Sequence, residues 1–163
     1  MSVRRSPQWK YGRGMAANKK TVLVINGPNL NLLGQRQPEI YGTATLEDHI
    51  NRMVEIGSAT GLKITAFQSN SSGEIVDRIH AARGKEDAII INAGAFTHYA
   101  WSIHDALAAF AGPKIEVHIS NPASREEWRQ QSVLAPVVHG SIAGFGGLGY
   151  DLAVAAVDSL LNI

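Results

Sequence analysis

Residues 21–28, Thr-Val-Leu-Val-Ile-Asn-Gly-Pro, are the stretch from which the fold can be worked out. Five β-branched or aliphatic residues in succession, ended by an Asn-Gly-Pro turn, predict a short strand that is buried on both faces. Such a strand is typical of a parallel sheet covered by helices on each side. We therefore expect the rest of the chain to supply further strands separated by helices.

The remaining segments alternate in this way. Apolar residues spaced as on one helix face predict a helix over 45–60, with Thr45 and Asp48 as a capping box and Gly61 as its stop. Further strands are predicted over 62–67, 87–93, 114–119 and near 137–142, and further helices from Ser72, near 99–111, near 124–131 and from about 148. This pattern predicts a single α/β domain over 21–163, a flavodoxin-like three-layer sandwich around a five-stranded parallel sheet in the order 2-1-3-4-5.

The composition limits the class of protein. A chain of 163 residues with 45% hydrophobic and 18% charged residues fits one globular domain and excludes a disordered or collagen-like protein. No apolar run approaches the roughly 20 residues of a membrane-spanning helix, so we expect no membrane partner. The chain has no cysteine, which fits a reducing cytoplasm, and its six histidines show no metal-ligand spacing. We therefore expect no metal site.

Residues 1–20 differ from the rest, because they carry six basic and no acidic side chains, while all 14 acidic residues follow. This segment lacks apolar periodicity, which predicts a disordered tail. Trp9 and Tyr11 among the cations are also compatible with nucleic-acid contact, and a basic terminus suits organelle targeting, with Met15 as an alternative start. We favour disorder and expect no nucleic-acid partner, since phosphate binding needs a shaped basic surface as well as charge.

Polar side chains gather where the predicted strands end. Asn26 and Asn29 follow the first strand, and Asn92 ends the strand over 87–93. Ligands of such sheets bind beyond the carboxyl ends of the strands, where the strand order reverses. Asparagine also forms turns, which is the interpretation we favour for Asn26. For Asn29 and Asn92, a turn and a site remain equally open.

Glu116, His118 and Ser120 alternate along the strand over 114–119 and so share one face. An acid and an imidazole inside a central parallel strand are costly unless they are paired. A Glu–His pair can be structural, but it also orients the imidazole and favours its protonated form, as a general acid requires. We favour the functional interpretation.

The connection over 27–42 is longer than a βα loop needs, which is typical of a lid. Arg36 and Tyr41 stand out within it. Taken singly, each is compatible with a solvated or packed side chain. Together over a crevice, the arginine would favour the tyrosinate, so that Tyr41 can serve as a base.

The segment Gly-Phe-Gly-Gly-Leu-Gly over 144–149 matches the dinucleotide fingerprint, but a dinucleotide fold needs another strand with an acidic residue roughly 20 residues on, and only 14 residues follow here. We interpret these glycines as allowing the last helix to pack closely.

Seven segments in one order resemble the type II 3-dehydroquinate dehydratases, flavodoxin-like enzymes of the shikimate pathway. They are NGPNLNLLG at 26–34, Arg-x-Pro-x-x-Tyr-Gly at 36–42, QSN at 68–70, NAGAFTHY at 92–99, EVHISN at 116–121, REEWR at 125–129 and GFGGLGY at 144–150. The resemblance runs from Val22 to the last helix.

The resemblance implies dehydration of 3-dehydroquinate to 3-dehydroshikimate through an enolate, without cofactor or metal. It implies that Tyr41 is the base and that Arg36 activates it. Asn29 is implied to hold a water that stabilises the enolate, and His118, with Glu116 as its partner, is implied to protonate the departing hydroxyl. The implied substrate-binding residues are Asn92, His98, Ile119, Ser120, Arg129 and, from a neighbouring subunit, Asp105. The implied assembly is a cytoplasmic homododecamer, a tetramer of trimers.

Three alternatives remain. The same reaction also serves quinate catabolism. A Schiff-base route needs a lysine in the crevice, yet Lys63, Lys85 and Lys114 all fall near the amino ends of predicted strands. A non-catalytic flavodoxin-like module for a nucleotide or flavin needs a phosphate-cradling loop after the first strand, where this chain has two glycines among bulky leucines.

Overall fold

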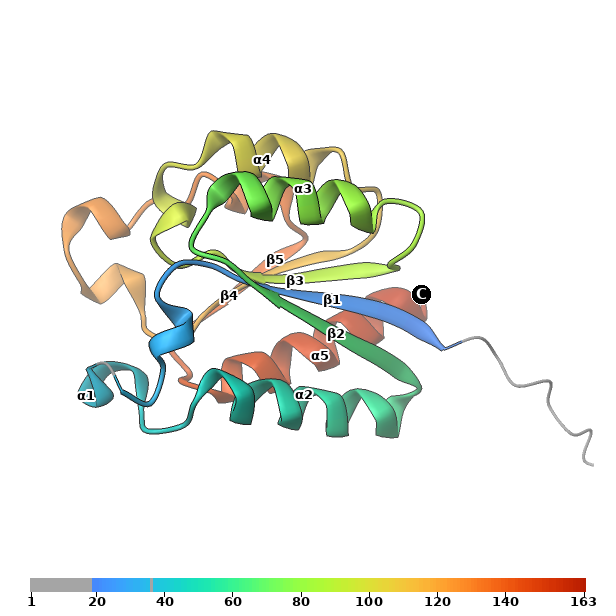
Figure 1. Cartoon of the computed structure of the whole chain (residues 1–163), viewed down its shortest axis with the longest axis horizontal. Coiled ribbons are helices and arrows are strands. Elements are labelled where there is room, and N and C mark those ends of the chain that lie inside the picture. Colours follow the sequence, from blue (N-terminus) through green and yellow to red (C-terminus); the bar gives the residue numbers. More distant parts are fainter. Residues whose placement is uncertain (1–18, 36) are drawn as a thin grey trace, which may run out of the picture.

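The computed structural model describes residues 19–35 and 37–163 and contains one five-stranded parallel sheet (Figure 1). Its strands are β1 (Lys20–Asn26), β2 (Leu62–Gln68), β3 (Ala88–Asn92), β4 (Lys114–His118) and β5 (Gly140–Ala143). Their order across the sheet is β2-β1-β3-β4-β5, which confirms the prediction. The predicted tail over 1–20 lies outside the described residues as far as residue 18.

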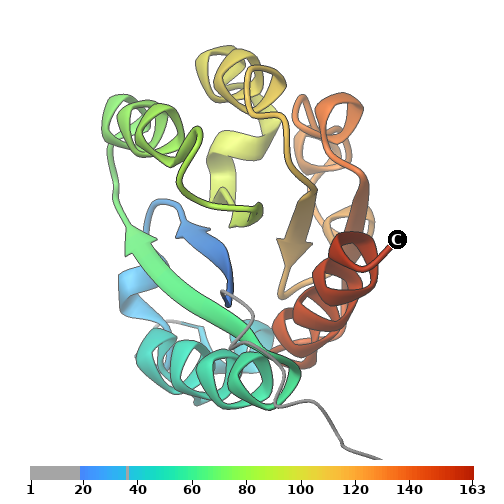
Figure 2. The same ribbon diagram turned by 90° about the vertical axis from the view of Figure 1, so that its right-hand side faces the viewer.

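Two pairs of helices cover the sheet, so the molecule has the three layers expected. The helices are α1 (Pro38–Tyr41), α2 (Leu46–Thr60), α3 (Ser72–Ala82), α4 (Trp101–Ala108) and α5 (Leu148–Leu161). Figures 1 and 2 show α3 and α4 on one face of the sheet and α2 and α5 on the other. Among the described residues, no helix combines the length and the apolar character needed to cross a membrane.

The sequence of β1 explains why both faces are covered. Successive side chains of a strand point to opposite faces, so Val22 and Val24 enter the core beside α2 and α5, whereas Leu23 and Ile25 enter the core beside α3 and α4. All four side chains are fully buried. A strand that is apolar at every position is stable only between two layers of helices, as predicted from residues 21–26.

Several element boundaries differ from the prediction. The predicted short helix near 124–131 is two 3-10 turns, Pro122–Ser124 and Glu127–Arg129. The last strand begins at Gly140 rather than near 137, because Pro136 lies in a 3-10 turn over Ala135–Val137. The predicted helix near 99–111 is α4, which is shorter at both ends. The capping box between Thr45 and Asp48 is present as predicted.

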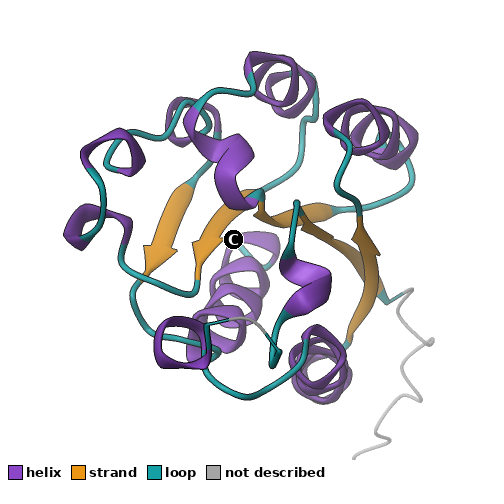
Figure 3. Cartoon of the chain, turned by 60° about the vertical axis from the view of Figure 1, so that its left-hand side comes forward, coloured by secondary structure: helices purple, strands orange, loops and turns teal. Residues whose placement is uncertain are grey.

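The connections that follow the carboxyl ends of the parallel strands lie together at one end of the sheet (Figure 3). They include the 3-10 turns Leu30–Leu32 after β1 and Gly94–His98 after β3. Gly27 and β3 approach so closely there that a Cβ at position 27 would lie 2.3 Å from the carbonyl oxygen of Ala93. Only glycine fits this contact, which brings the loops after β1 and β3 together.

Candidate active site

A cavity opens at the carboxyl ends of the strands, at the point where the strand order reverses between β1 and β3. Its empty volume of about 720 Å³ includes space open to solvent. Eight of the predicted site residues line it: Asn29, Tyr41, Asn92, His98, His118, Ile119, Ser120 and Arg129. Side chains from loops far apart in the sequence therefore meet where a small molecule can bind.

The other predicted site residues do not line this cavity. Glu116 is 1% exposed and lies beneath His118. Asp105 is exposed on α4. Arg36 is outside the described residues. Asn26, for which a turn was favoured, is buried at the end of β1. It accepts a hydrogen bond from Tyr150 of α5.

His118 and Glu116 form the pair predicted from their alternation in β4. Nε2 of His118 lies 2.9 Å from Oε1 of Glu116. Because a carboxylate oxygen accepts, Nε2 carries the hydrogen of this bond. Nδ1 is then the ring nitrogen that can hold and release a second proton. Since His118 lines the cavity, this proton can be delivered to a bound molecule.

Three hydroxyl groups from three elements surround the same carboxylate. Thr97 donates to Oε1 of Glu116, Ser132 donates to both oxygens at 2.8 and 3.0 Å, and Ser141 donates to Oε2 at 3.1 Å. Burial alone raises the pKa of the Glu116 carboxyl. However, the hydrogen bond and positive charge of His118, with the hydroxyls of Thr97 and Ser132, hold this pKa below its ordinary value. The carboxylate therefore stays ionised under the imidazole.

This shift predicts that Glu116→Gln makes the unfolding free energy less sensitive to acid. Because the folded-state pKa lies below the ordinary 4.5, the stabilisation from Glu116 is complete above that value. It is lost as the pH falls through the folded-state pKa, because the unfolded chain takes up the proton first. Glutamine does not titrate. In the variant, the slope of the unfolding free energy against pH should therefore be smaller by up to about 1.4 kcal/mol per pH unit, which corresponds to one proton. Urea unfolding at successive acidic pH values measures this slope, and equal slopes would contradict the prediction.

Tyr41, at the end of α1, meets an arginine that the sequence analysis had not singled out. Nη1 of Arg125 donates to the Tyr41 hydroxyl oxygen at 2.8 Å, and its guanidinium carbon lies 5.7 Å from the centre of the Tyr41 ring. Arg125 thus takes the place beside the Tyr41 oxygen that the sequence analysis had ascribed to Arg36. Arg125 belongs to the REEWR segment, where only Arg129 had been considered. The match of this segment to the family was the sequence signal from which Arg125 could have been found.

Glu126 connects the two arginines of this segment. Its Oε2 accepts from Nε of Arg129 at 2.8 Å and lies 3.6 Å from Nε of Arg125. Both arginines line the cavity, so the carboxylate holds two cations at its mouth. This arrangement suits the binding of an anionic or hydroxyl-bearing small molecule.

Asn29 adopts the left-handed conformation, with φ of 65°, at the start of the turn after β1. Asparagine tolerates this region better than most side chains. Its backbone N–H donates to Oδ1 of Asn70 at 3.0 Å, and Nε2 of Gln68 donates to the same oxygen at 3.2 Å. The QSN segment, which begins at the last residue of β2, therefore fixes the loop that presents Asn29 to the cavity.

His98 is placed to accept a hydrogen bond. Its Nδ1 lies 2.7 Å from the carbonyl oxygen of Gln131, so this nitrogen donates. Burial lowers the pKa of His98, although the bond to Gln131 opposes the shift. In the neutral ring, Nε2 keeps a lone pair that can accept from a hydroxyl of a bound molecule.

Fold and site together define an α/β protein with an acid–base site for a small molecule. Within the described ranges, no three His, Asp or Glu side chains are grouped so as to hold a metal ion. A tyrosine held by an arginine and a histidine held by a glutamate face one cavity, which suits the removal of one proton and the delivery of another.

The comparisons with known proteins specify this class. Residues 20–158 match the family model described as dehydroquinase class II. The chain is 50% identical over 138 residues to a 3-dehydroquinate dehydratase of Halalkalibacterium halodurans, a match that covers 85% of this chain and 95% of that protein. It is 48% identical to a catabolic 3-dehydroquinase of Talaromyces marneffei, over 82% of this chain and 77% of that protein. The solved type II dehydroquinase of Propionibacterium acnes superposes with a TM-score of 0.83 at 44% identity, covering 86% and 97% of the two chains. The chain belongs to the class II dehydroquinase family.

Proposed function

We propose that the chain catalyses the reaction named for its relatives, the dehydration of 3-dehydroquinate to 3-dehydroshikimate, with Tyr41 as base and His118 as acid. The observation that carries the proposal is that these two side chains line one cavity and that each has a partner of complementary charge, Arg125 and Glu116. Elimination of water beside a ketone through an enolate uses such a combination of a base and an acid.

In the first step, the tyrosinate of Tyr41 removes a proton from the carbon next to the ketone, and the electron pair of the C–H bond forms the enolate. Asn29 lines the same cavity as Tyr41 and holds the water that stabilises the enolate oxygen. Arg36, outside the described residues, is proposed from its sequence motif to supply a further positive charge near Tyr41. Arg125 is proposed to hold the Tyr41 oxygen in place through the hydrogen bond that it donates.

In the second step, the enolate collapses to the conjugated ketone and the C–O bond to the departing hydroxyl breaks. His118 gives its Nδ1 proton to this hydroxyl, which leaves as water. The imidazolium thus becomes neutral while Tyr41 holds the abstracted proton. Transfer of one proton from tyrosine to histidine, through solvent, restores the starting state.

The remaining lining residues bind the substrate. Asn92, the backbone amides of Ile119 and Ser120, and Arg129 hold its polar groups, and the Nε2 lone pair of His98 accepts from a hydroxyl. None of the lysines that the structure describes lines the cavity. Lys114 lies at the amino end of β4, away from the cavity, and donates to the carbonyl oxygen of Phe110 at 2.6 Å.

A spectroscopic assay tests this function. Mixed with 3-dehydroquinate, the protein should produce the ultraviolet absorbance of a conjugated enone. Borohydride added with substrate should leave the activity intact, because no imine forms. A protein that gives no absorbance change, or that borohydride inactivates only when substrate is present, would refute the proposal. Saturable nucleotide or flavin binding without turnover would instead indicate a binding module.

We further propose that the enzyme works in the shikimate pathway, in the cytoplasm, as a homododecamer built from four trimers. The resemblance and the lack of cysteine support this setting. Asp105 is exposed and absent from the lining of its own cavity, so it is free to reach a neighbouring site. Light scattering should give the mass of twelve chains, and Asp105→Ala should raise KM. A fully active monomer would contradict this assembly.

A further inference from the structure

Tyr150, near the start of α5, joins the ends of the neighbouring strands β1 and β3 through one buried hydroxyl. The hydroxyl donates to Oδ1 of Asn26 at 2.6 Å and accepts from Nδ2 of Asn92 at 3.0 Å. Asn26 and Asn92 are partners in the parallel register of β1 and β3. Tyr150 is 0% exposed, so these bonds are shielded from bulk solvent. Burial also raises the pKa of Tyr150, which keeps its hydroxyl protonated as a donor.

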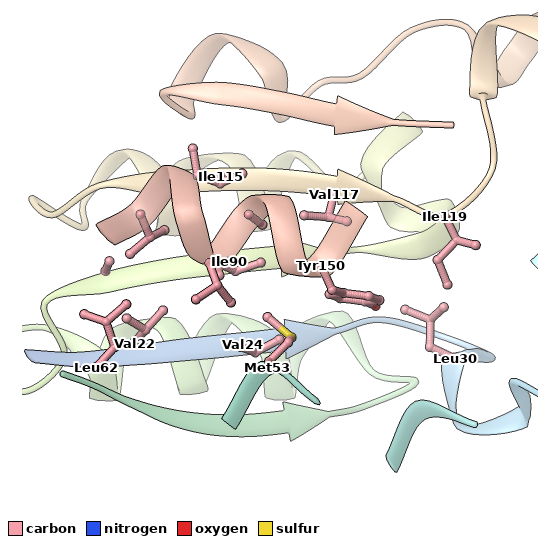
Figure 4. Packing of buried hydrophobic residues seen from close by; sticks show 14 of the residues in the cluster. Val22, Val24, Leu30, Met53, Leu62, Ile90, Ile115, Val117, Ile119 and Tyr150 are labelled. Carbon is pink, nitrogen blue, oxygen red and sulfur yellow. The ribbon is translucent and has the colours of Figure 1, made fainter. Parts of the chain in front are cut away.

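The glycine-rich segment before α5 explains how the tyrosine reaches this position. A Cβ at position 147 would lie 2.3 Å from the ring of His49, and one at position 149 would lie 3.4 Å from Val117. Gly147 therefore lets the start of α5 approach α2, whereas a Cβ at position 149 would make only an ordinary contact with β4. Figure 4 shows the Tyr150 ring between Val117 of β4 and Met53 of α2, with Leu30 and Ile119 beyond it toward the cavity edge.

The Tyr150 hydroxyl and the Gly94 N–H together determine which way the Asn92 side chain faces. Oδ1 of Asn92 accepts from the backbone N–H of Gly94 at 3.2 Å, and Nδ2 donates one of its two hydrogens to Tyr150. The second hydrogen of Nδ2 remains available, and Asn92 lines the cavity. Without the hydroxyl, the amide would keep only the bond from the Gly94 N–H, and its nitrogen would no longer be held by a partner.

Asn26 shows that the hydroxyl has no substitute in this part of the structure. Asn26 is 1% exposed, and its Nδ2 has no hydrogen-bond partner among the described residues. Among the described residues, Tyr150 is the one hydrogen-bond donor to its Oδ1, and Asn26 does not line the cavity. The three side chains form one unit with a single end, Asn92, that can contact a ligand.

We propose that Tyr150 is a positioning residue for substrate binding: its hydroxyl holds the Asn92 amide in the orientation that donates to 3-dehydroquinate in the cavity. The inference rests on the proposed function and adds a residue that lies outside the cavity lining. It gives the last segment of the resemblance, GFGGLGY, a part in substrate binding.

A double-mutant cycle tests the proposal. Tyr150→Phe removes the hydroxyl and keeps the ring, so KM for 3-dehydroquinate should rise about tenfold while kcat changes less than about threefold. In an Asn92→Ala background, the same substitution should leave KM unchanged. Tyr99→Phe, at an exposed tyrosine outside the cavity lining, is the matched control and should match wild type.

A merely structural role predicts something different, namely a lower melting temperature with the same KM in both backgrounds, and that result would overturn the proposal. Should Tyr150→Phe fail to fold, Asn26→Ala removes the acceptor that orients the hydroxyl, and KM should rise by several-fold only when Asn92 is present. Wild-type turnover is measured first. If it is absent, the proposed function fails, whereas turnover with an unchanged KM in the folded variants refutes only the role of Tyr150.

Discussion

Tyr41→Phe should lower kcat for the dehydration of 3-dehydroquinate by about a thousandfold or more, with little change in KM. The substitution removes the only atom of this side chain that can take the proton, and general-base catalysis typically contributes about 10²–10⁴-fold. Arg125 would then face a ring edge instead of the oxygen to which it donates at 2.8 Å. The initial rate of enone absorbance measures the loss, and circular dichroism reports whether the fold is kept.

Tyr99→Phe provides the control for this substitution, because it removes the same atom from a tyrosine that is 58% exposed and outside the cavity lining. Its activity should equal that of wild type. If Tyr41→Phe kept more than about a tenth of the wild-type kcat, Tyr41 would not be the base. A neighbouring group of the cavity would then have to remove the proton.

The sheet could be predicted from the sequence because buried parallel strands leave a strong local signal. Four of the five strands both begin and end within about two residues of their predicted limits, and the capping box at Thr45 marked the start of α2. The Glu116–His118 pair could be predicted for the same reason, since alternation along a strand fixes which side chains share a face.

Arg125 could not be found in this way. It lies between two 3-10 turns, where no periodicity indicates direction, and its partner Tyr41 is 84 residues away. The hydroxyls around Glu116 were missed for a related reason. Thr97, Ser132 and Ser141 come from a turn, a loop and an edge strand, and such residues are common at the surface. Only the packing of these elements brings them onto one carboxylate.

Proton removal and loss of water should be separable, because different side chains carry them. His118→Asn is expected to lower the rate of dehydration by about 10²–10⁴-fold, since the hydroxyl must then leave without an acid. Tyr41 is untouched, so the enolate should still form and return to substrate. Asparagine is preferred to alanine because it keeps a polar amide near Glu116, a buried carboxylate that loses its bond from Nε2 of His118.

Deuterium exchange makes this separation visible. In D₂O, 3-dehydroquinate recovered from His118→Asn should carry deuterium next to the ketone, detected by mass spectrometry, although little product has formed. Substrate recovered from Tyr41→Phe should carry almost none. His80→Asn, at an exposed histidine of α3, should dehydrate substrate as wild type does. If exchange in His118→Asn fell as far as dehydration, proton removal would also depend on His118, and the division of roles between the two side chains would be wrong.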